Sequence, residues 1–264
     1  MVDYQAEYDN VAKVPGYGAI VAGWQARAAQ FRDARPRGEM GIAYGAGERQ
    51  KLDFYAAGQQ APVVLFVHGG YWQKLHRDDF SHFAAGLLAR GVSVAMPSYD
   101  LCPQVTMGEI VAQVRAAAAL VARRSGRTML AMGHSAGGHL AAMLLATDWP
   151  ALGLPRGTVH GALSVSGLFD LAPLLQTTIG DALRMDVQTA RDLSPMLMAA
   201  PGLPIHAMVG GDEGAEYARQ SAGIAEAWGG SWSSAPGRNH FTLVEEMARP
   251  DSEVTERAVA MAGG

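Results

Sequence analysis

Cysteine and positive charge are both scarce in this sequence of 264 residues. The single cysteine, Cys102, cannot form an internal disulfide, which fits a reducing compartment. The formal net charge is −4 and no long run of lysines and arginines occurs, so the electrostatic pattern of a nucleic-acid-binding protein is missing. Polyanionic partners are therefore not expected.

Targeting and membrane-spanning patterns are also missing. Asp3 and Glu7 lie near the start, where a secretory signal peptide needs a basic region followed by an apolar run. The longest continuous apolar stretch beside a predicted strand, Pro62 to Val67, is far shorter than the roughly 20 residues that span a bilayer. These absences predict a cytoplasmic protein that is not inserted in a membrane.

The overall composition is that of a globular protein. Hydrophobic residues make up 49% of the chain and charged residues 17%, a balance that can bury a sizeable interior. The length is compatible with one large domain. We therefore predict a single α/β domain over residues 1–264, with an N-terminal helical segment at about 1–35 and a cap-like insertion at about 171–200.

From residue 62 onward, short apolar runs alternate with helical patterns, which indicates βαβ units and a largely parallel sheet. The continuous apolarity of the runs suits strands that are covered by helices on both faces. An antiparallel hairpin at about 40–45 and 50–56 is expected at one sheet edge, giving about eight strands. The other predicted strands are Val63–Val67, Val92–Met96, Thr128–Met132, Ala162–Val165, Ile205–Val209 and, with a weaker pattern, Ser231–Ala235.

Helical patterns occupy the intervals. Thr106 and Glu109 form a capping box that predicts a helix continuing to about Arg124. Residues 17–33 predict an amphipathic helix over the main body, which we interpret as structural. Further helices are expected at 79–90, 138–147, 215–228 and 252–261.

The strongest chemical signal is Gly133-His134-Ser135-Ala136-Gly137, a G-x-S-x-G motif between a predicted strand and a predicted helix. The glycines relieve crowding at a sharp strand-to-helix turn, which lifts the serine hydroxyl above the sheet at a helix N-terminus that favours negative charge. A glycine-rich turn with an idle serine is the alternative, but the strand–turn–helix context favours a nucleophile. We therefore predict that Ser135 is the catalytic nucleophile.

A second glycine-rich segment, His68-Gly69-Gly70-Tyr71-Trp72, follows the first predicted strand of the parallel part. A tight turn would explain it, but its position one βα unit before the serine motif is that of a loop lining an oxyanion hole. Its backbone N–H groups, with the amide that follows the serine, would then face the carbonyl oxygen of a substrate. We expect His68 to brace this loop, and Tyr71 and Trp72 to line the acyl pocket.

The general base is expected after the last strand, in keeping with the chain order serine, acid, histidine. His240 has that position, within Gly237–Phe241. The other histidines lie in the serine motif or at helix and strand starts and show no metal-ligand spacing, so no metal site is expected. His240 is the predicted base.

The acid that orients the histidine is expected in the loop after the strand that ends at Val209. That loop contains two adjacent carboxylates, Asp212 and Glu213. Glu213 lies three residues after Gly210, the spacing usual in this type of hydrolase, and neighbours on a turn generally point in different directions. We favour Glu213 as the acid and keep Asp212 as the alternative.

Several segments resemble the kynurenine formamidase (arylformamidase) branch of the α/β-hydrolases, which is related to the hormone-sensitive-lipase-like esterases. The most specific likeness is Tyr71 followed by Trp72, because the esterase relatives have a third glycine where this chain has the tyrosine. The likeness runs almost from end to end. The other segments that carry it are Tyr8–Asn10, Tyr99–Pro103, Gly133–Leu140, Ser166–Leu171, Arg219–Ser221 and Gly237–Phe241.

The resemblance implies an α/β-hydrolase fold with a triad of Ser135, Glu213 and His240. Animal members of the family have an aspartate where Glu213 aligns, so Asp212 stays open as the acid. The oxyanion hole implied by the resemblance is formed by the amides of Gly70, Tyr71 and Ala136, and we include Gly69 of the same loop in the predicted site.

The implied reaction is hydrolysis of a small acyl amide or ester through an acyl-enzyme, without a metal or organic cofactor. N-formyl-kynurenine or a similar arylformamide is the first expected substrate, and a short-chain carboxylic ester is the alternative. A non-catalytic receptor on the same fold would be expected to have lost a triad residue, whereas all three are present. The sequence does not decide between a monomer and a homodimer.

Overall fold

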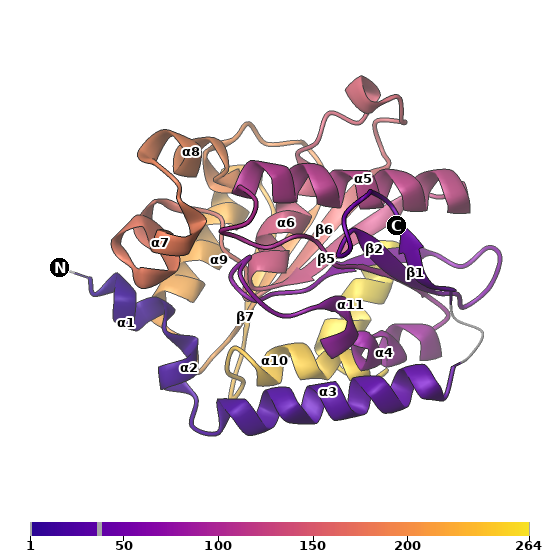
Figure 1. The fold of residues 1–264 in the computed structure, drawn as a ribbon, viewed down its shortest axis with the longest axis horizontal. Helices are drawn as coiled ribbons and strands as arrows, with labels where there is room; N and C mark the ends of the chain where they lie inside the picture. Colours follow the sequence, from indigo (N-terminus) through magenta and orange to yellow (C-terminus); the bar gives the residue numbers. More distant parts are fainter. Residues whose placement is uncertain (1, 36–38, 264) are drawn as a thin grey trace.

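The computed structural model describes residues 2–35 and 39–263, and an eight-stranded sheet lies at its centre (Figure 1). The strand order is β1-β2-β4-β3-β5-β6-β7-β8. β2 pairs antiparallel with both β1 and β4, and the remaining neighbours pair in parallel. The predicted fold class, a mostly parallel α/β-hydrolase sheet, is confirmed. The strands are β1 (Glu39–Ala43), β2 (Lys51–Tyr55), β3 (Val63–Val67), β4 (Ser93–Pro97), β5 (Met129–His134), β6 (Val159–Val165), β7 (Ile205–Gly210) and β8 (Ser231–Ala235).

The predicted strands are confirmed, with one notable difference in length. β6 begins at Val159 and not at Ala162, because its pairing with β5 continues through Gly161. The half-buried His160 and the glycine interrupt the apolar run in the sequence, and the pairing continues past them with a register shift, from Met129 with Val159 to Leu130 with Gly161. Backbone pairing therefore extends further than hydrophobicity alone indicates.

The helices agree with the sequence patterns except in one segment. The capping box is present, since the Glu109 amide donates to Thr106 Oγ1 at 3.2 Å and the Thr106 amide donates to Glu109 Oε2 at 2.7 Å. The segment 79–90 is not one helix but two 3₁₀ turns followed by α4, because Phe80 and Phe83 are both fully buried and residues three apart eclipse in a 3₁₀ turn. The helices are α1 (Tyr4–Tyr8), α2 (Asn10–Lys13), α3 (Tyr17–Asp33), α4 (Ala84–Ala89), α5 (Met107–Ser125), α6 (Ala136–Leu145), α7 (Thr178–Leu183), α8 (Val187–Asp192), α9 (Ala215–Trp228), α10 (Thr242–Glu245) and α11 (Glu253–Ala262).

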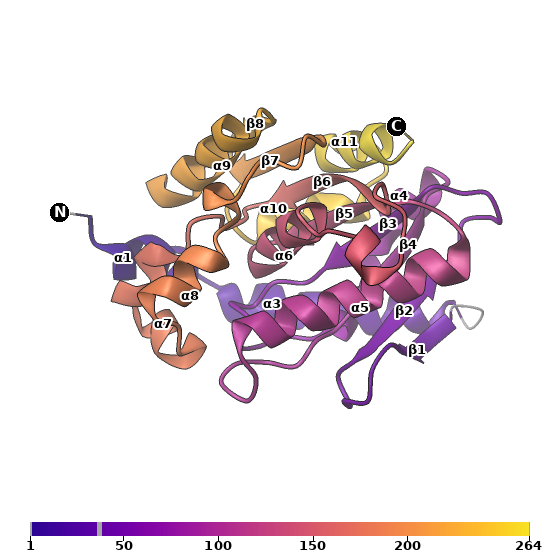
Figure 2. The ribbon, with the colours of Figure 1, turned by 90° about the horizontal axis from the view of Figure 1, so that it is seen from above.

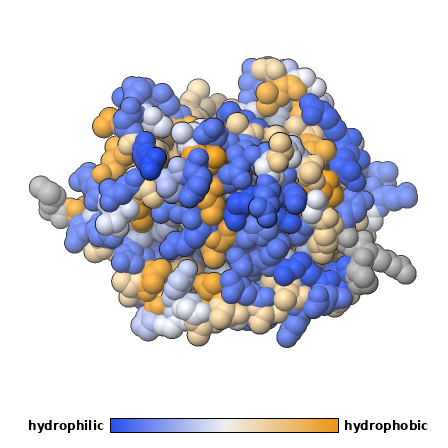
Figure 3. Space-filling model, viewed as in Figure 1, coloured by the Kyte–Doolittle hydropathy of each residue, from blue (hydrophilic) through white to orange (hydrophobic). Residues whose placement is uncertain are grey.

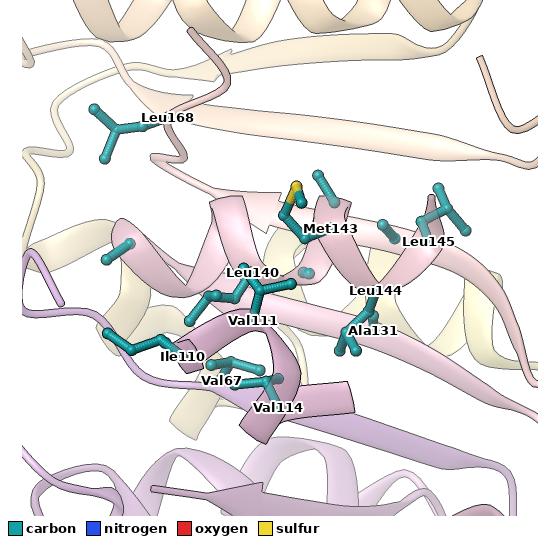
Figure 4. Packing of buried hydrophobic residues seen from close by; sticks show 14 of the residues in the cluster. Val67, Ile110, Val111, Val114, Ala131, Leu140, Met143, Leu144, Leu145 and Leu168 are labelled. Atoms are coloured by element: carbon teal, nitrogen blue, oxygen red, sulfur yellow. The ribbon is translucent and has the colours of Figure 1, made fainter. Parts of the chain in front are cut away.

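Two hydrophobic layers cover the two faces of the sheet. Within β3, Val63, Leu65 and Val67 belong to one layer, whereas Val64 and Phe66 belong to the other, as the two-residue period of a strand requires. The first layer packs under α5, α6 and α9, and Figure 4 shows side chains of α5 and α6 meeting those of β3 and β5. The second layer packs against α3, α4, α10 and α11, which lie together on the opposite side in Figure 1.

The first two helices, α1 and α2, and the segment 171–200 lie at one end of the sheet. α1 lies beside α7, as the views in Figures 1 and 2 agree. The segment consists of α7, α8 and two 3₁₀ turns, Ala172–Gln176 and Pro195–Leu197. On the face shown in Figure 3, hydrophilic residues predominate and hydrophobic ones form scattered patches. In the described part of the chain, every helix is too short or too polar to cross a membrane.

Candidate active site

Ser135 lies at a sharp turn between β5 and α6. Its φ of 56° and ψ of −120° are sparsely populated for a residue with a side chain, and such a conformation costs on the order of 1–3 kcal/mol. Glycine is needed on both sides of it. A Cβ atom on Gly133 would lie 2.0 Å from Gly137 O, and one on Gly137 would lie 2.0 Å from Val67 O. The G-x-S-x-G pattern therefore folds as the sequence predicts.

His240 and Glu213 form a buried pair beside this turn. His240 Nδ1 lies 2.7 Å from Glu213 Oε2, and the two side chains are only 5% and 1% exposed. The other carboxylate oxygen, Oε1, accepts hydrogen bonds from the Gly210 amide at 2.7 Å and from Ser166 Oγ at 2.5 Å. Asp212 is exposed, so the structure brings Glu213 and not its neighbour to the histidine.

His240 is held in place by a hydrogen bond to its backbone carbonyl oxygen and by two neighbouring rings. His134 Nε2 donates to the His240 carbonyl oxygen at 2.8 Å, and burial holds the pKa of His134 well below its ordinary value. The centroid of the His240 ring lies 4.8 Å from that of His134 and 4.8 Å from that of Tyr217. A neutral His134 therefore supports the candidate base without placing a second charge beside it.

Ser135 and His240 line one small pocket of about 40 Å³. No hydrogen bond joins Ser135 Oγ to His240 among the described residues, and such bonds are often loose before substrate binds. Besides these two residues, the pocket is lined by Asn10, Val11, Tyr17, Trp24, Gly70, Tyr71, Lys74, Leu75, His134 and Phe241.

The predicted oxyanion loop lies directly against the serine turn. A Cβ atom on Gly69 would lie 2.8 Å from His134 O and 3.1 Å from Ser135 Cβ, so only glycine allows this approach. Gly70 and Tyr71 have φ values of 114° and 50°, which turn the backbone sharply. In the described part of the chain, the amides of Gly69, Gly70, Tyr71 and Ala136 donate no hydrogen bond, and Gly70 and Tyr71 line the pocket together with Ser135.

His68 and Trp72 lie behind this loop. His68 Nδ1 lies 2.7 Å from Gly69 O, and the imidazole ring stacks on Tyr99 with centroids 4.4 Å apart. Burial lowers the pKa of His68 to about 3, so the ring is neutral and braces the loop as expected. Trp72 is fully buried against His139 and does not line the pocket, so its position does not favour the predicted contact with substrate.

The N-terminal segment contributes pocket residues that the sequence patterns did not identify. Tyr17 and Trp24 of α3 line the pocket, in addition to packing that helix against the main body as expected. The Tyr71 hydroxyl donates to Tyr8 O at 2.6 Å. Asn10 Nδ2 donates to the hydroxyls of Tyr71 and Tyr217, at 3.0 and 2.7 Å respectively. The family-like segment Tyr8–Asn10 was the one signal that could have pointed to this role.

The fold and the arrangement of these residues define an α/β-hydrolase of the arylformamidase and esterase type. Residues 52–150 match the BD-FAE family model. Kynurenine formamidase of Salmo salar is 31% identical over 241 residues, covering 85% of this chain and 82% of that protein. The chain therefore belongs to the kynurenine formamidase family.

Solved structures agree with this fold. A Silicibacter protein provisionally described as a thioesterase is 33% identical and covers 100% of both chains, with a TM-score of 0.91. A hormone-sensitive lipase from a metagenome library is 18% identical and covers 89% of both chains, with a TM-score of 0.69. The second likeness concerns the fold alone.

Proposed function

We propose that this chain is a serine arylformamidase that hydrolyses N-formyl-kynurenine or a similar small arylformamide. The observation that carries the proposal is the buried pair of His240 and Glu213 at the pocket that contains Ser135. A serine at a strained turn, a histidine and a carboxylate supply the nucleophile, the base and the orienting acid of acyl transfer. The family relationship supports a formamide as the bond that is cleaved.

In the first half of the reaction, Ser135 Oγ attacks the formyl carbon and its proton passes to His240 Nε2. Glu213 Oε2 stabilises the resulting imidazolium through its contact with Nδ1. The carbonyl oxygen becomes an oxyanion, which accepts hydrogen bonds from the free amides of the oxyanion loop and of Ala136. Collapse of this intermediate breaks the C–N bond as His240 donates its proton to the departing arylamine nitrogen.

In the second half, water replaces the amine. His240 removes a proton from the water, the hydroxide adds to the formyl carbon of the Ser135 ester, and the serine leaves with a proton returned by the histidine. Formate is the second product. An arylamine is a poor leaving group, so proton donation by His240 matters more for a formamide than for a phenyl ester.

The pocket favours a small acyl group and a flat leaving group. The Tyr71 ring lines it beside Gly70 and Ser135, so a bulky side chain stands next to the acyl position, which suits a formyl or acetyl group better than a long chain. Tyr17, Trp24, Tyr71 and Phe241 all line it, and aromatic stacking adds about 0.5–1.5 kcal/mol beyond burial. These walls support an aryl leaving group.

A substrate panel tests the proposal. We expect kcat/KM for N-formyl-kynurenine of about 10⁴ M⁻¹s⁻¹ or more, lower values for phenyl acetate and a short acyl thioester, and little turnover of phenyl decanoate. The Ser135→Ala variant serves as the control for contaminating hydrolases, and a fluorophosphonate should label the unaltered chain but not that variant. Turnover of esters or the thioester alone would make this an esterase, and absence of labelling would favour a receptor.

A further inference from the structure

The pocket at Ser135 has an uneven distribution of charge. Among the described residues that line it, Lys74 is the one lysine or arginine, and no aspartate or glutamate contributes. The Glu213 carboxylate lies behind His240, where it is hydrogen-bonded on both oxygens and 1% exposed. The lining residues therefore include a cation and no carboxylate, while Asp9 and Asp79 act on Tyr71 and Tyr17 from outside the pocket.

Lys74 differs from other cations on the N-terminal side of the molecule. Lys13 pairs with Glu7, and Arg27 pairs with Glu245. Within residues 2–35 and 39–263, by contrast, no carboxylate forms an ion pair with the exposed Lys74 side chain. Its charge is available to a ligand.

The backbone places the Lys74 residue in the loop that adjoins Ser135. The amides of Gln73 and Lys74 both donate to Gly70 O, at 3.0 and 3.1 Å, so Lys74 belongs to the same tight turn as the oxyanion amides. A Cβ atom on Gly70 would lie 2.2 Å from Lys74 O, which shows how closely the turn closes on itself. The stem of the lysine therefore begins at a fixed position relative to the oxyanion hole.

We propose that Lys74 is a specificity-determining residue that binds a carboxylate on the leaving group of the substrate. A formyl or acetyl group carries no charge, so the anion must lie on the leaving-group side. This inference rests on the proposed function in one respect, namely that the substrate is cleaved at Ser135. It adds that an aryl leaving group with an amino-acid-like carboxylate is preferred over a neutral one.

Matched substrates with and without a carboxylate test the inference. We take the ratio of kcat/KM for 4-carboxyphenyl acetate to that for phenyl acetate, and the same ratio for 4-carboxyformanilide and formanilide. Lys74→Met should lower these ratios about five- to tenfold through KM, Lys74→Glu should lower them further, and Lys74→Arg should restore most of the preference. Each ratio compares two substrates on the same variant, so a general loss of activity cancels, and added salt should reduce the preference of the unaltered enzyme.

Lys51→Met is the matched control, because Lys51 lies on β2 and does not line the pocket. The inference is overturned if the ratios are the same in the unaltered enzyme, Lys74→Met and Lys74→Glu, or if Lys51→Met lowers them equally. The two proposals fail in different ways. If the esters show the Lys74-dependent ratio but the formamides are not cleaved, only the formamidase proposal is wrong. If the formamides are cleaved but the ratios do not change in the Lys74 variants, only the lysine proposal is wrong.

Discussion

The turn that contains Ser135 and the N-terminal segment that covers it are built in opposite ways. The turn is specified by glycines two residues away on either side of the serine, whose close contacts are with each other and with the neighbouring strand β3. The N-terminal segment is held by contacts across the whole chain, since Asn10 bonds to Tyr71 and Tyr217. The position of the candidate nucleophile is therefore determined by nearby residues, whereas the wall of its pocket depends on residues that are distant in the sequence.

Substitutions in these two regions should therefore affect different kinetic parameters. Changes at the catalytic groups should abolish the chemical step and leave the fold intact. Changes in the N-terminal segment should alter how substrate is held, while the chemical step continues. The predictions below test this division, starting with the largest expected effect.

Replacing the proposed nucleophile should have the largest effect. Ser135→Ala should lower kcat about 10⁴-fold or more, because the covalent route is lost. The circular dichroism spectrum and Tm should stay close to those of the unaltered enzyme, because alanine has the same Cβ atom as serine and the backbone conformation at this turn is unchanged. Substantial turnover by a variant preparation free of contaminating hydrolases would disprove the assignment.

The two adjacent carboxylates offer a sharper local test. Glu213→Gln should lower kcat about 10²- to 10⁴-fold, because an amide cannot stabilise the imidazolium of His240. Asp212→Asn is the matched control and should change kcat less than about threefold, since that side chain is exposed. Steady-state kinetics on both variants decide the matter, and the opposite ranking would reassign the acid.

The N-terminal segment should respond differently. Asn10→Ala removes the hydrogen bonds to Tyr71 and Tyr217, so we expect KM to rise about three- to tenfold while kcat changes less than about threefold. Gln25→Ala is the control, because Gln25 lies in the same segment but bonds to the surface residue Asp79. A large loss of kcat in the Asn10 variant would show that the segment takes part in the chemical step.

Acid should destabilise the protein through buried histidines, which lie outside the N-terminal segment. Burial lowers the pKa of His82 and His139 to about 4, whereas unfolded histidine titrates near 6.5. Between these values the unfolded chain binds more protons, so stability should fall as the pH is lowered from about 6.5 to 4. Residues 2–35 contain no histidine.

Calorimetry from pH 7 to pH 4.5 measures this effect. His82 is the residue to change, because neither of its ring nitrogens has a hydrogen-bond partner among the described residues. In His82→Gln, Tm should fall less over this pH range than in the unaltered protein. An equal fall in both would mean that His82 does not contribute to the acid sensitivity.

Much of the fold could be predicted because its signals are periodic and short. The run Val63–Val67 is a strand with the predicted bounds, and the capping box of α5 forms as expected. The same holds for the bounds of α3 and α9. Local patterns sufficed wherever neighbouring residues determine the backbone.

The contacts in the candidate site could be predicted less completely from local sequence patterns. Spacing favoured Glu213 over Asp212, and the structure brings Glu213 to His240. No spacing rule indicated that Ser166 would donate to that carboxylate, because the two residues meet only where β6 and β7 end side by side. Trp72 follows Tyr71 directly, yet it points into the core, since the strained turn sends consecutive side chains in different directions.

The residues that line the pocket are far apart in the sequence, which affects when the site can form during synthesis. Ser135 follows Asn10 by 125 residues, and His240 follows Ser135 by another 105, so His240 emerges from the ribosome last of the three. A nascent chain that already contains the serine turn still lacks its candidate base. Activity is therefore expected only after His240 has been made, and Asn10 can reach Tyr217 only after α9 has been made.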